Sequence, residues 1–462
     1  MGYNHMKLRT VAMYALVGVT VLILGALAGW YFFISTQTKT TVAEDTARGY
    51  ISAPLAGKGS DAGGATSVAG TLPKSPAAGK GVFSRIWDTI TRRDTGVSDP
   101  STFASFNQDQ AGFTTDASQA TDLPAKLSGE RPPRLWHVEK KPVAGMAFVK
   151  NGSSEYLRYV DRGSGNVFEA DPKTGDTTRL TNTLISRVYE ATVTGSGRVI
   201  GRSIDEIGVV TTFIGSVATS SEATSSARSL LTADLPKNIA YIVADPKTDA
   251  LFYLTSEAGT AVGIRSEWNG AKPKRMFGSP IMHWRPWWLA DGRIVLVQAA
   301  ADSVPGYAYE LTGDGSLVPL LRAIPGLTLL PRASGAMLYG RSDSGTLALF
   351  AQINATTTAT RLPIKTIADK CAWSTGRDPV AYCGVPQGFA AQNFLDDWYR
   401  GMVHSSDAIW LVDARAGSAE VLYTPDSSLS LDIARPAVDS TGGYIAFINA
   451  ADQSLWILRT KD

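Results

Sequence analysis

The sequence is poor in the residue types on which most protein chemistry depends. It contains two cysteines and four histidines among 462 residues, too few for a disulfide-dense scaffold or a four-thiolate zinc site. Charged residues make up 19% of the chain, and the formal net charge is only +2. That balance argues against a nucleic-acid-binding surface covered in lysine and arginine. We therefore expect no cofactor, no bound metal and no nucleic-acid partner.

Sequence motifs with a known catalytic mechanism are also missing. The chain has no HExxH, no GxSxG, no phosphate-binding P-loop and no EF-hand loop. The string at 341–346 is faintly similar to the Asp-box turn of sialidases, but Asp, Ser and Gly are typical of any tight hairpin. The sequence thus predicts a protein that is not an enzyme.

Apolar and turn-forming residues are plentiful. Hydrophobic residues make up 44% of the chain, which also has 44 glycines and 23 prolines. Most of the chain can therefore bury a core, and it contains more turns than a helical bundle uses. A length of 462 residues predicts two or three segments.

One long apolar run lies near the N-terminus. Residues 10–34 include no charged side chain across 25 positions, enough for a helix that crosses a hydrocarbon core of about 30 Å. Lys7 and Arg9 precede the run, which predicts a cytoplasmic segment 1–9 and export of everything that follows the span. We expect a single-pass protein of the cell membrane. A cleaved signal peptide is the alternative, because the small residues at 26–28 resemble a cleavage site.

The predicted span contains a GxxxG pair formed by Gly25 and Gly29. Such a pair lets two helices approach closely, so a homodimer through the membrane helix is one interpretation. The other is that both are ordinary lipid-facing glycines.

Residues 35–130 are rich in Ala, Gly, Ser, Thr and Asp and indicate a flexible extracytoplasmic linker. One island, predicted as a short amphipathic helix over 82–93, places Phe83, Ile86, Trp87 and Ile90 on one face. This helix would rest on an anionic membrane surface, dock on the head or on a partner, or form only transiently. Residues 1–93 hold ten Lys and Arg against four Asp and Glu, so the rest of the chain carries a balance of −4.

The head, residues 131–462, consists of short β-rich runs separated by Gly, Asp, Pro and Ser turns. Seven units recur at roughly the spacing of propeller blades, and they span 144–181, 187–215, 239–268, 285–321, 327–353, 369–424 and 434–460. The last unit ends after three strands, and the segment 134–138 is predicted to supply its fourth strand and close the ring. The sequence therefore predicts an all-β, seven-bladed propeller of four-stranded blades. Six or eight blades, or a β-sandwich, are the alternatives.

The last unit, with PAV at 436–438, DSTGG at 439–443, YIAF at 444–447 and LWIL at 455–458, resembles the repeats of TolB-type and WD40-like propellers. The stretches 157–191 and 370–413 are similar to an uncharacterised family of membrane-anchored, WD40-like bacterial proteins. This resemblance covers essentially the whole head. It implies a propeller held in the bacterial cell envelope, and it implies no activity.

The two cysteines lie on adjacent predicted strands joined by a turn at 375–378. In an oxidising exterior Cys371 and Cys383 would form a cross-strand disulfide, and two buried free thiols are the alternative.

Two aromatic clusters are candidates for a binding site. One opens the fourth unit at 283–288, and the other is the insertion 386–404 between the second and third strands of the sixth unit. Loops of these two kinds open on the same face of a propeller, so both clusters are expected on one rim around the channel mouth. Trp284, Trp287 and Trp288 would alternatively belong to the core between blades. The candidate rim contains residue types that dominate binding hot spots: His283, Trp284, Arg285, Trp287, Phe389, Phe394, Asp396, Asp397, Trp398, Tyr399 and Arg400.

These features favour a binding module that presents this rim to a protein, peptide or glycan. A structural part of an envelope, secretion or pilus assembly is the second hypothesis. The third, a glycan-acting enzyme, requires carboxylates or arginines that converge on the propeller channel.

Overall fold

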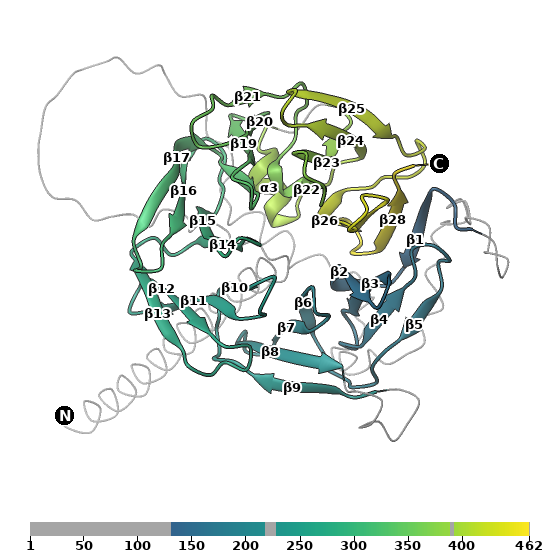
Figure 1. Cartoon of the computed structure of the whole chain (residues 1–462), viewed down its shortest axis with the longest axis vertical. Helices are drawn as coiled ribbons and strands as arrows, with labels where there is room; N and C mark the ends of the chain where they lie inside the picture. The colour runs from purple at the N-terminus through teal and green to yellow at the C-terminus, as the bar shows by residue number, and fades with distance from the viewer. Residues whose placement is uncertain (1–130, 218–227, 389–391, 462) are drawn as a thin grey trace, which may run out of the picture. The chain divides into compact units, whose positions relative to one another are not determined.

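In a computed structural model of the chain, the structure describes residues 131–461 except 218–227 and 389–391. These residues form seven four-stranded antiparallel sheets, arranged as the blades of one ring (Figure 1). The predicted all-β, seven-bladed propeller is confirmed. The predicted segment 1–9, membrane span and linker lie outside the described residues. Within the part of the chain that the structure does describe, no helix is long and apolar enough to cross a membrane.

In blades 1 to 6 the chain passes from the inner to the outer strand. Blade 1 is β2 (Val143–Asn151), β3 (Ser154–Asp161), β4 (Val167–Ala170) and β5 (Thr177–Arg179), and blade 2 is β6 (Val188–Val193), β7 (Val199–Ile204), β8 (Val210–Val217) and β9 (Leu230–Asp234). Blade 3 is β10 (Tyr241–Ala244), β11 (Leu251–Glu257), β12 (Thr260–Ser266) and β13 (Lys274–Ser279), and blade 4 is β14 (Trp284–Trp288), β15 (Ile294–Gln298), β16 (Pro305–Leu311) and β17 (Leu317–Pro325). Blade 5 is β18 (Thr328–Pro331), β19 (Met337–Asp343), β20 (Thr346–Gln352) and β21 (Thr360–Arg361), and blade 6 is β22 (Cys371–Trp373), β23 (Val380–Pro386), β24 (Asp407–Asp413) and β25 (Ser418–Tyr423). Blade 7 is β26 (Ile433–Val438), β27 (Tyr444–Asn449) and β28 (Leu455–Arg459), with β1 (Leu135–Glu139) as its outer strand.

The core lies between neighbouring blades. β27 has the sequence YIAFIN, and five of its six residues are buried, as expected for a strand covered on both faces. Leu330, Leu338 and Leu349 of blade 5 pack with Cys371, Cys383 and Val412 of blade 6 in one apolar cluster. Stacking blades around an axis is what hides both faces of each apolar strand from water.

The two ends of the described chain close the ring. β1 pairs antiparallel with β28, with Leu135 opposite Leu458 and Trp136 opposite Ile457. Trp136 is buried and meets Tyr444 edge to face, with 6.2 Å between the ring centroids. This closure confirms the predicted pairing of the segment 134–138 with the last unit. It also covers the edge that β28 would otherwise expose.

Three consecutive blades have an irregular inner strand. The register shifts between Ala434 and Ala437 in β26, between Val143 and Gly145 in β2, and between Val188 and Glu190 in β6. The inner-strand pairings of the other four blades are regular. Such bulges turn side chains away from their alternating positions, and those in β2 and β6 occur at the start of their strands.

The insertion predicted in the sixth unit folds into α3 (Phe394–Arg400), which lies inside the ring next to β22 (Figure 1). The 3₁₀-helix η2 (Ala368–Lys370) leads into β22. We call the side of the ring that carries α3 the helix face. It is built by the loops between the second and third strands of each blade and by the connections that enter each inner strand.

Candidate functional site: charged groups on the axis of the ring

The helix α3 is held against the inner strands by its own apolar side chains. Phe394 and Trp398 follow the i, i+4 spacing, as do Leu395 and Tyr399, and all four are buried. They pack with Leu347, Ile367 and Ala434 of blades 5 to 7. The helix ends at Gly401, which adopts the left-handed conformation (φ 65°) that glycine tolerates at a helix C-terminus.

The aromatic side chains of the insertion that the structure describes, Phe394, Trp398 and Tyr399, are all buried. Only 3% of Trp398 is exposed, so the helix turns its large rings toward the blades beneath it. The physical reason is that a long loop crossing this face would leave large apolar groups in water, and a short amphipathic helix buries them.

Beneath α3 lies a fully buried ammonium group. Lys370 Nζ donates to Asp407 Oδ2 at 2.7 Å and to Ser405 Oγ at 2.9 Å, and it also donates to Asp432 Oδ1. The indole N–H of Trp398 donates to the same Asp432 carboxylate at 2.8 Å. Lys370 also lies over the Trp398 ring, 4.9 Å from its centroid. A buried charge persists only when it is paired and hydrogen-bonded in this way.

The two carboxyl groups around Lys370 titrate in opposite directions. Burial raises the pKa of Asp407 and outweighs the effect of the nearby Lys370 ammonium. Burial also opposes ionisation of Asp432, but Lys370 and the donors Trp398 and His404 lower its pKa overall.

The two clusters singled out in the sequence meet on the axis. Arg285 of β14 donates to the Tyr399 hydroxyl of α3 at 3.0 Å and forms an ion pair with Asp369. The Tyr399 hydroxyl in turn donates to Asp369 Oδ2 at 2.9 Å. Burial disfavours the Arg285 cation, yet the Asp369 carboxylate holds the pKa of Arg285 above its ordinary value.

A second set of charged side chains lies at blades 7, 1 and 2, the blades whose inner strands are bulged. Arg202 of β7 pairs with Glu190 Oε2 of β6 at 2.6 Å, and Arg435 of β26 reaches Glu190 Oε1 at 3.3 Å. Arg435 also donates to the carbonyl of Ala144 at 3.0 Å. Burial would raise the pKa of Glu190, but Arg202, Arg435 and Arg285 together lower it. We refer to Glu190, Arg202, Arg285, Asp369, Tyr399 and Arg435 as the axial cluster.

The remaining predicted rim residues have separate positions. Trp284 and Trp288 belong to the core between blades 3 and 4, which agrees with their alternative interpretation. Trp287 and His283 are partly buried, and burial lowers the pKa of His283. Asp396 Oδ1 accepts the backbone N–H of Asp302 at 2.9 Å and so anchors α3 to blade 4.

Three predicted rim residues remain: Asp397, Arg400 and Phe389. Asp397 lies 3.9 Å from Arg400, an exposed residue at the end of α3. Phe389 lies outside the described residues. The predicted membrane or partner helix of Phe83, Ile86, Trp87 and Ile90, and the pair Gly25 and Gly29, also lie outside them.

Cys371 and Cys383 are direct cross-strand partners in blade 6 and form a disulfide in the structure. Both are buried in the core between blades 5 and 6. Of the two alternatives left open by the sequence, the structure has the bonded form.

Most of the charged groups on the axis were not predicted from the sequence: Glu190, Arg202, Asp369, Lys370, Asp407, Asp432 and Arg435. A usable signal was present. Single charged residues stand at the start of otherwise apolar inner strands, as in VYEATV at 188–193 and IARPAV at 433–438. Among the described residues, no group of three or more His, Cys, Asp and Glu side chains is arranged to hold a metal ion.

The helix face also exposes apolar side chains. Large exposed apolar residues in its loops are Leu184 (74% exposed), Ile207 (69%) and Met402 (69%), with Val304 and Ile281. The other large apolar residues exposed in the described parts of the chain, Leu231, Val318 and Val421, lie on outer strands.

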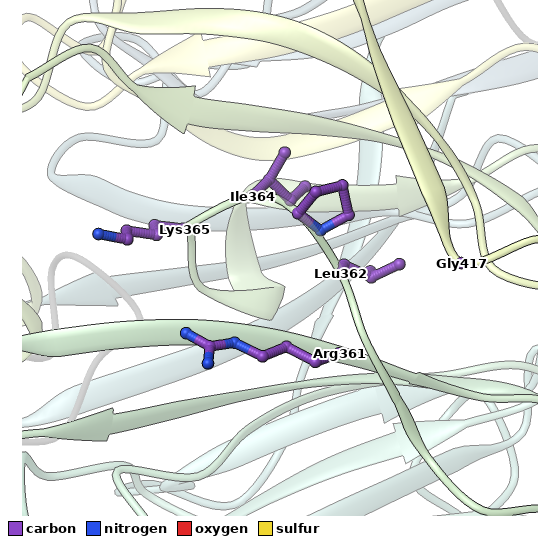
Figure 2. A pocket seen from close by; sticks show the side chains of 6 residues that line it. Arg361, Leu362, Ile364, Lys365 and Gly417 are labelled. Atoms are coloured by element: carbon purple, nitrogen blue, oxygen red, sulfur yellow. The ribbon is translucent and has the colours of Figure 1, made fainter.

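A separate pocket of about 400 Å³ lies at the outer edge between blades 5 and 6. Its lining is Arg361, Leu362, Pro363, Ile364, Lys365 and Gly417. Figure 2 shows the side chains of Arg361 and Lys365 directed to the same side. These residues come from an outer strand, the segment after it and an outer turn, and they include none of the axial cluster. We take the axial cluster as the candidate site because charge and burial coincide there.

No protein-family model matches the chain, and no curated protein matches it in sequence. Among solved structures, it is similar to an oligogalacturonate lyase from Vibrio parahaemolyticus, with a TM-score of 0.49 and 10% identity over 72% of this chain and 97% of the other. It is also similar to the β-propeller domain of the Trilobed protease from Pyrococcus furiosus, with a TM-score of 0.44 and 9% identity over 71% and 97% of the two chains. These likenesses concern the fold alone, and the count of seven blades rests on the strand pairing.

Proposed function

We propose that the propeller is a binding module whose helix face docks a protein or peptide partner. The observation that carries this proposal is that most of the large exposed apolar side chains of the described residues lie in loops of one face, the helix face. Leu184, Ile207, Ile281, Val304 and Met402 come from different loops, yet all lie on the helix face. A glycan is the less favoured ligand, since sugar-binding surfaces have little use for separate aliphatic side chains around their rim.

The rigid blades suit this role because they hold the loops in fixed positions. The predicted span at 10–34 and the linker at 35–130 support placing the module outside the membrane, on a flexible tether. In that setting the helix face would meet partners in the cell envelope. A part in an envelope or secretion assembly is compatible with the same surface.

A glycan-acting enzyme is the second candidate, favoured by one observation. Such an enzyme requires carboxylates or arginines that converge on the propeller channel, and Glu190, Asp369, Arg285 and Arg435 form ion pairs there. The lowered pKa of Glu190 suits an ionised group, not a proton donor. A Glu190→Gln variant that abolishes release of reducing ends from envelope glycans would support this activity.

The binding role is tested by co-purification of partners with the full-length protein from its own membranes. Ile207→Asp and Met402→Asp place a charge on the helix face at side chains that are already exposed, so the fold should be unaffected. Leu231→Asp and Val421→Asp are matched controls on outer strands. We expect the helix-face variants to lose the co-purified proteins and the controls to keep them. Equal retention by all four variants would reject the docking surface.

A further inference from the structure

The pocket at the outer edge between blades 5 and 6 is shaped by a short, bent segment of the chain. The outer strand β21 has only two residues, and the chain bends at Pro363 and Ile364 soon after it. The side chains of Leu362 and Ile364 are buried in the core between the two blades, whereas Arg361, Pro363 and Lys365 are exposed. This alternation directs two cations to the same side, as Figure 2 shows.

The turn between β24 and β25 supplies the other side of the pocket. Gly417 of this turn has a φ of 68°, and a Cβ on it would lie 2.8 Å from Thr360 Cγ2. The turn therefore packs closely on β21 at a position where glycine avoids backbone strain. Asp413, which ends β24, accepts the backbone N–H groups of Arg415 and Ala416 at 2.8 and 2.9 Å. Its carboxylate is thus engaged within the turn itself.

The two cations of the pocket have no acidic partner among the described residues. None of the six lining residues is acidic. Within the described parts of the chain, neither Arg361 nor Lys365 forms an ion pair or a side-chain hydrogen bond. Arg293 of blade 4, by contrast, pairs with both Asp291 and Glu310. Two like charges on one side of a pocket repel each other, and an anion bound between them removes that repulsion.

The lining indicates the chemical class of the anion. A guanidinium offers parallel N–H donors that match phosphate oxygens, and an ammonium adds a compact point charge. A phosphate monoester carries a charge of about −1.5 to −2 at neutral pH, which matches two cations better than a single carboxylate does. Apolar atoms of Leu362, Pro363 and Ile364 line the same pocket, and its volume of about 400 Å³ leaves room for a group attached to the phosphate.

We propose that this pocket binds a phosphate monoester that carries an apolar group. Arg361 binds phosphate oxygens through its paired donors, Lys365 supplies the second positive charge, and the apolar group lies against Pro363. The pocket includes none of the axial cluster. The inference therefore goes beyond the proposed docking function and does not rest on it, so either can fail without the other.

The first test compares three small probes on the unaltered full-length protein by isothermal titration calorimetry. The probes are butyl phosphate, inorganic phosphate and butanol. Burial of about two CH₂ groups is enough for a tenfold gain, so we expect butyl phosphate to bind at least about tenfold more tightly than inorganic phosphate. Butanol should not bind measurably, and added salt should weaken butyl phosphate because the contact is between opposite charges. Equal affinity for butyl phosphate and either of the other probes overturns the inference, as does the absence of binding.

The second test locates the contact. Arg361→Gln and Lys365→Gln should each weaken butyl phosphate by at least about tenfold, because each removes a charged hydrogen-bond donor. Arg361→Lys should recover part of the loss through its charge alone. Arg322→Gln and Lys274→Gln are matched controls, because both residues are exposed cations on the outer strands of other blades. Unchanged affinity in Arg361→Gln, or an equal loss in the controls, contradicts the assignment to this pocket.

A phosphate monoester of this kind is either a soluble compound or the headgroup of a lipid. Dihexanoyl phosphatidic acid, a phosphate monoester with two short acyl chains, separates the two sources. If it binds more tightly than butyl phosphate and competes with it, the pocket takes a lipid headgroup. If only butyl phosphate binds, the pocket takes a soluble ester. Both results support the inference, and binding of neither probe overturns it.

Discussion

Single buried charges distinguish the centre of this propeller from its blades. Lys370, Asp432 and Asp407 are all buried, and removing such groups from water costs several kcal/mol each unless partners replace the solvent. The protein places these partners on different elements: Asp432 precedes β26, Asp407 begins β24, and Trp398 belongs to α3. One ammonium group thereby joins two blades to the helix that covers them.

Replacement of Lys370 should be costly. In Lys370→Met the Asp432 and Asp407 carboxyl groups lose their buried cation, and we expect the free energy of unfolding to fall by about 3–5 kcal/mol. Lys365→Met is the control, because Lys365 is an exposed lysine of the same connection and its loss should be near zero. Denaturant unfolding measures both variants. A change below about 1 kcal/mol in Lys370→Met would mean that this network does not stabilise the fold.

Acid should destabilise the head through its ionised carboxylates. The folded-state pKa of Glu190 lies below its ordinary value of 4.5, and that of Asp432 lies below 3.8. Below these ordinary values the unfolded chain binds more protons than the folded one, so stability is present at higher pH and is lost as pH falls through the folded pKa values. The raised pKa of Asp407 acts in the opposite sense.

This dependence is measured by unfolding at a series of pH values between 6 and 3. Glu190→Gln should show a shallower loss of stability below about pH 4.5 than the natural protein. An unchanged slope would show that Glu190 is not held in its ionised form by the surrounding arginines.

At the scale of elements, the inner strands carry the specific features of the protein. β2, β6 and β26 are bulged, and the bulges bring Ala144, Glu190 and Arg435 together. β2 and β6 also approach closely, because a Cβ on Gly145 would lie 1.8 Å from the carbonyl oxygen of Ala191. Hydrophobic patterns predict where such strands lie, but a bulge depends on the pairing of two strands and leaves no period in the sequence.

A methyl group at Gly145 should disturb this contact. In Gly145→Ala the backbone of β6 must move, and we expect a loss of about 1–3 kcal/mol in unfolding free energy. Gly313→Ala is the control, since a Cβ there meets nothing within 4 Å. Calorimetric or denaturant unfolding compares the two, and equal stability of both variants would contradict the close approach.

The helix α3 shows a limit of sequence reasoning at the same scale. The sequence predicted that Arg285 and the insertion share one face of the ring. In the structure Arg285 contacts Tyr399 of the insertion. The burial of its aromatic side chains was not predicted. An aromatic composition indicates that the loop makes apolar contacts. Whether those contacts are with another molecule or with the protein's own blades depends on the surface beneath the loop.

At the scale of the whole molecule, the head is a closed ring whose last blade is made from both ends. β1 is short, yet it covers β28 and buries Trp136 against Tyr444. An open edge there would invite pairing with other chains. Closure therefore contributes to stability and keeps the edge from aggregation.

Shortening the side chain that anchors this closure should weaken the ring. Trp136→Ala removes a buried tryptophan from the outer strand of blade 7, and we expect a loss of about 3–5 kcal/mol in unfolding free energy. Val318→Ala, an exposed position on the outer strand of blade 4, should change little. Size-exclusion chromatography of Trp136→Ala should also show association through the freed edge. Equal stability of both variants would count against the role of the closure.

The location of the head is a prediction from residues outside the described part. If the span at 10–34 exports the head, a protease that cannot cross membranes should digest residues 131–462 in intact spheroplasts. Immunoblotting for the C-terminus follows the digestion, with a cytoplasmic protein as the protected control. Protection of the head until the membrane is lysed would reverse the predicted topology.

The sequence by itself determined the architecture: seven apolar β-rich units, the missing fourth strand of the last one, and the segment that supplies it. These follow from local sequence patterns. Each strand must bury its apolar faces, and each turn between strands requires turn-forming residues such as Gly, Asp, Pro and Ser. The tertiary structure alone decided the site. Glu190, Arg202 and Arg435 come from three strands of two blades, and only closure of the ring brings their charges within reach of one another.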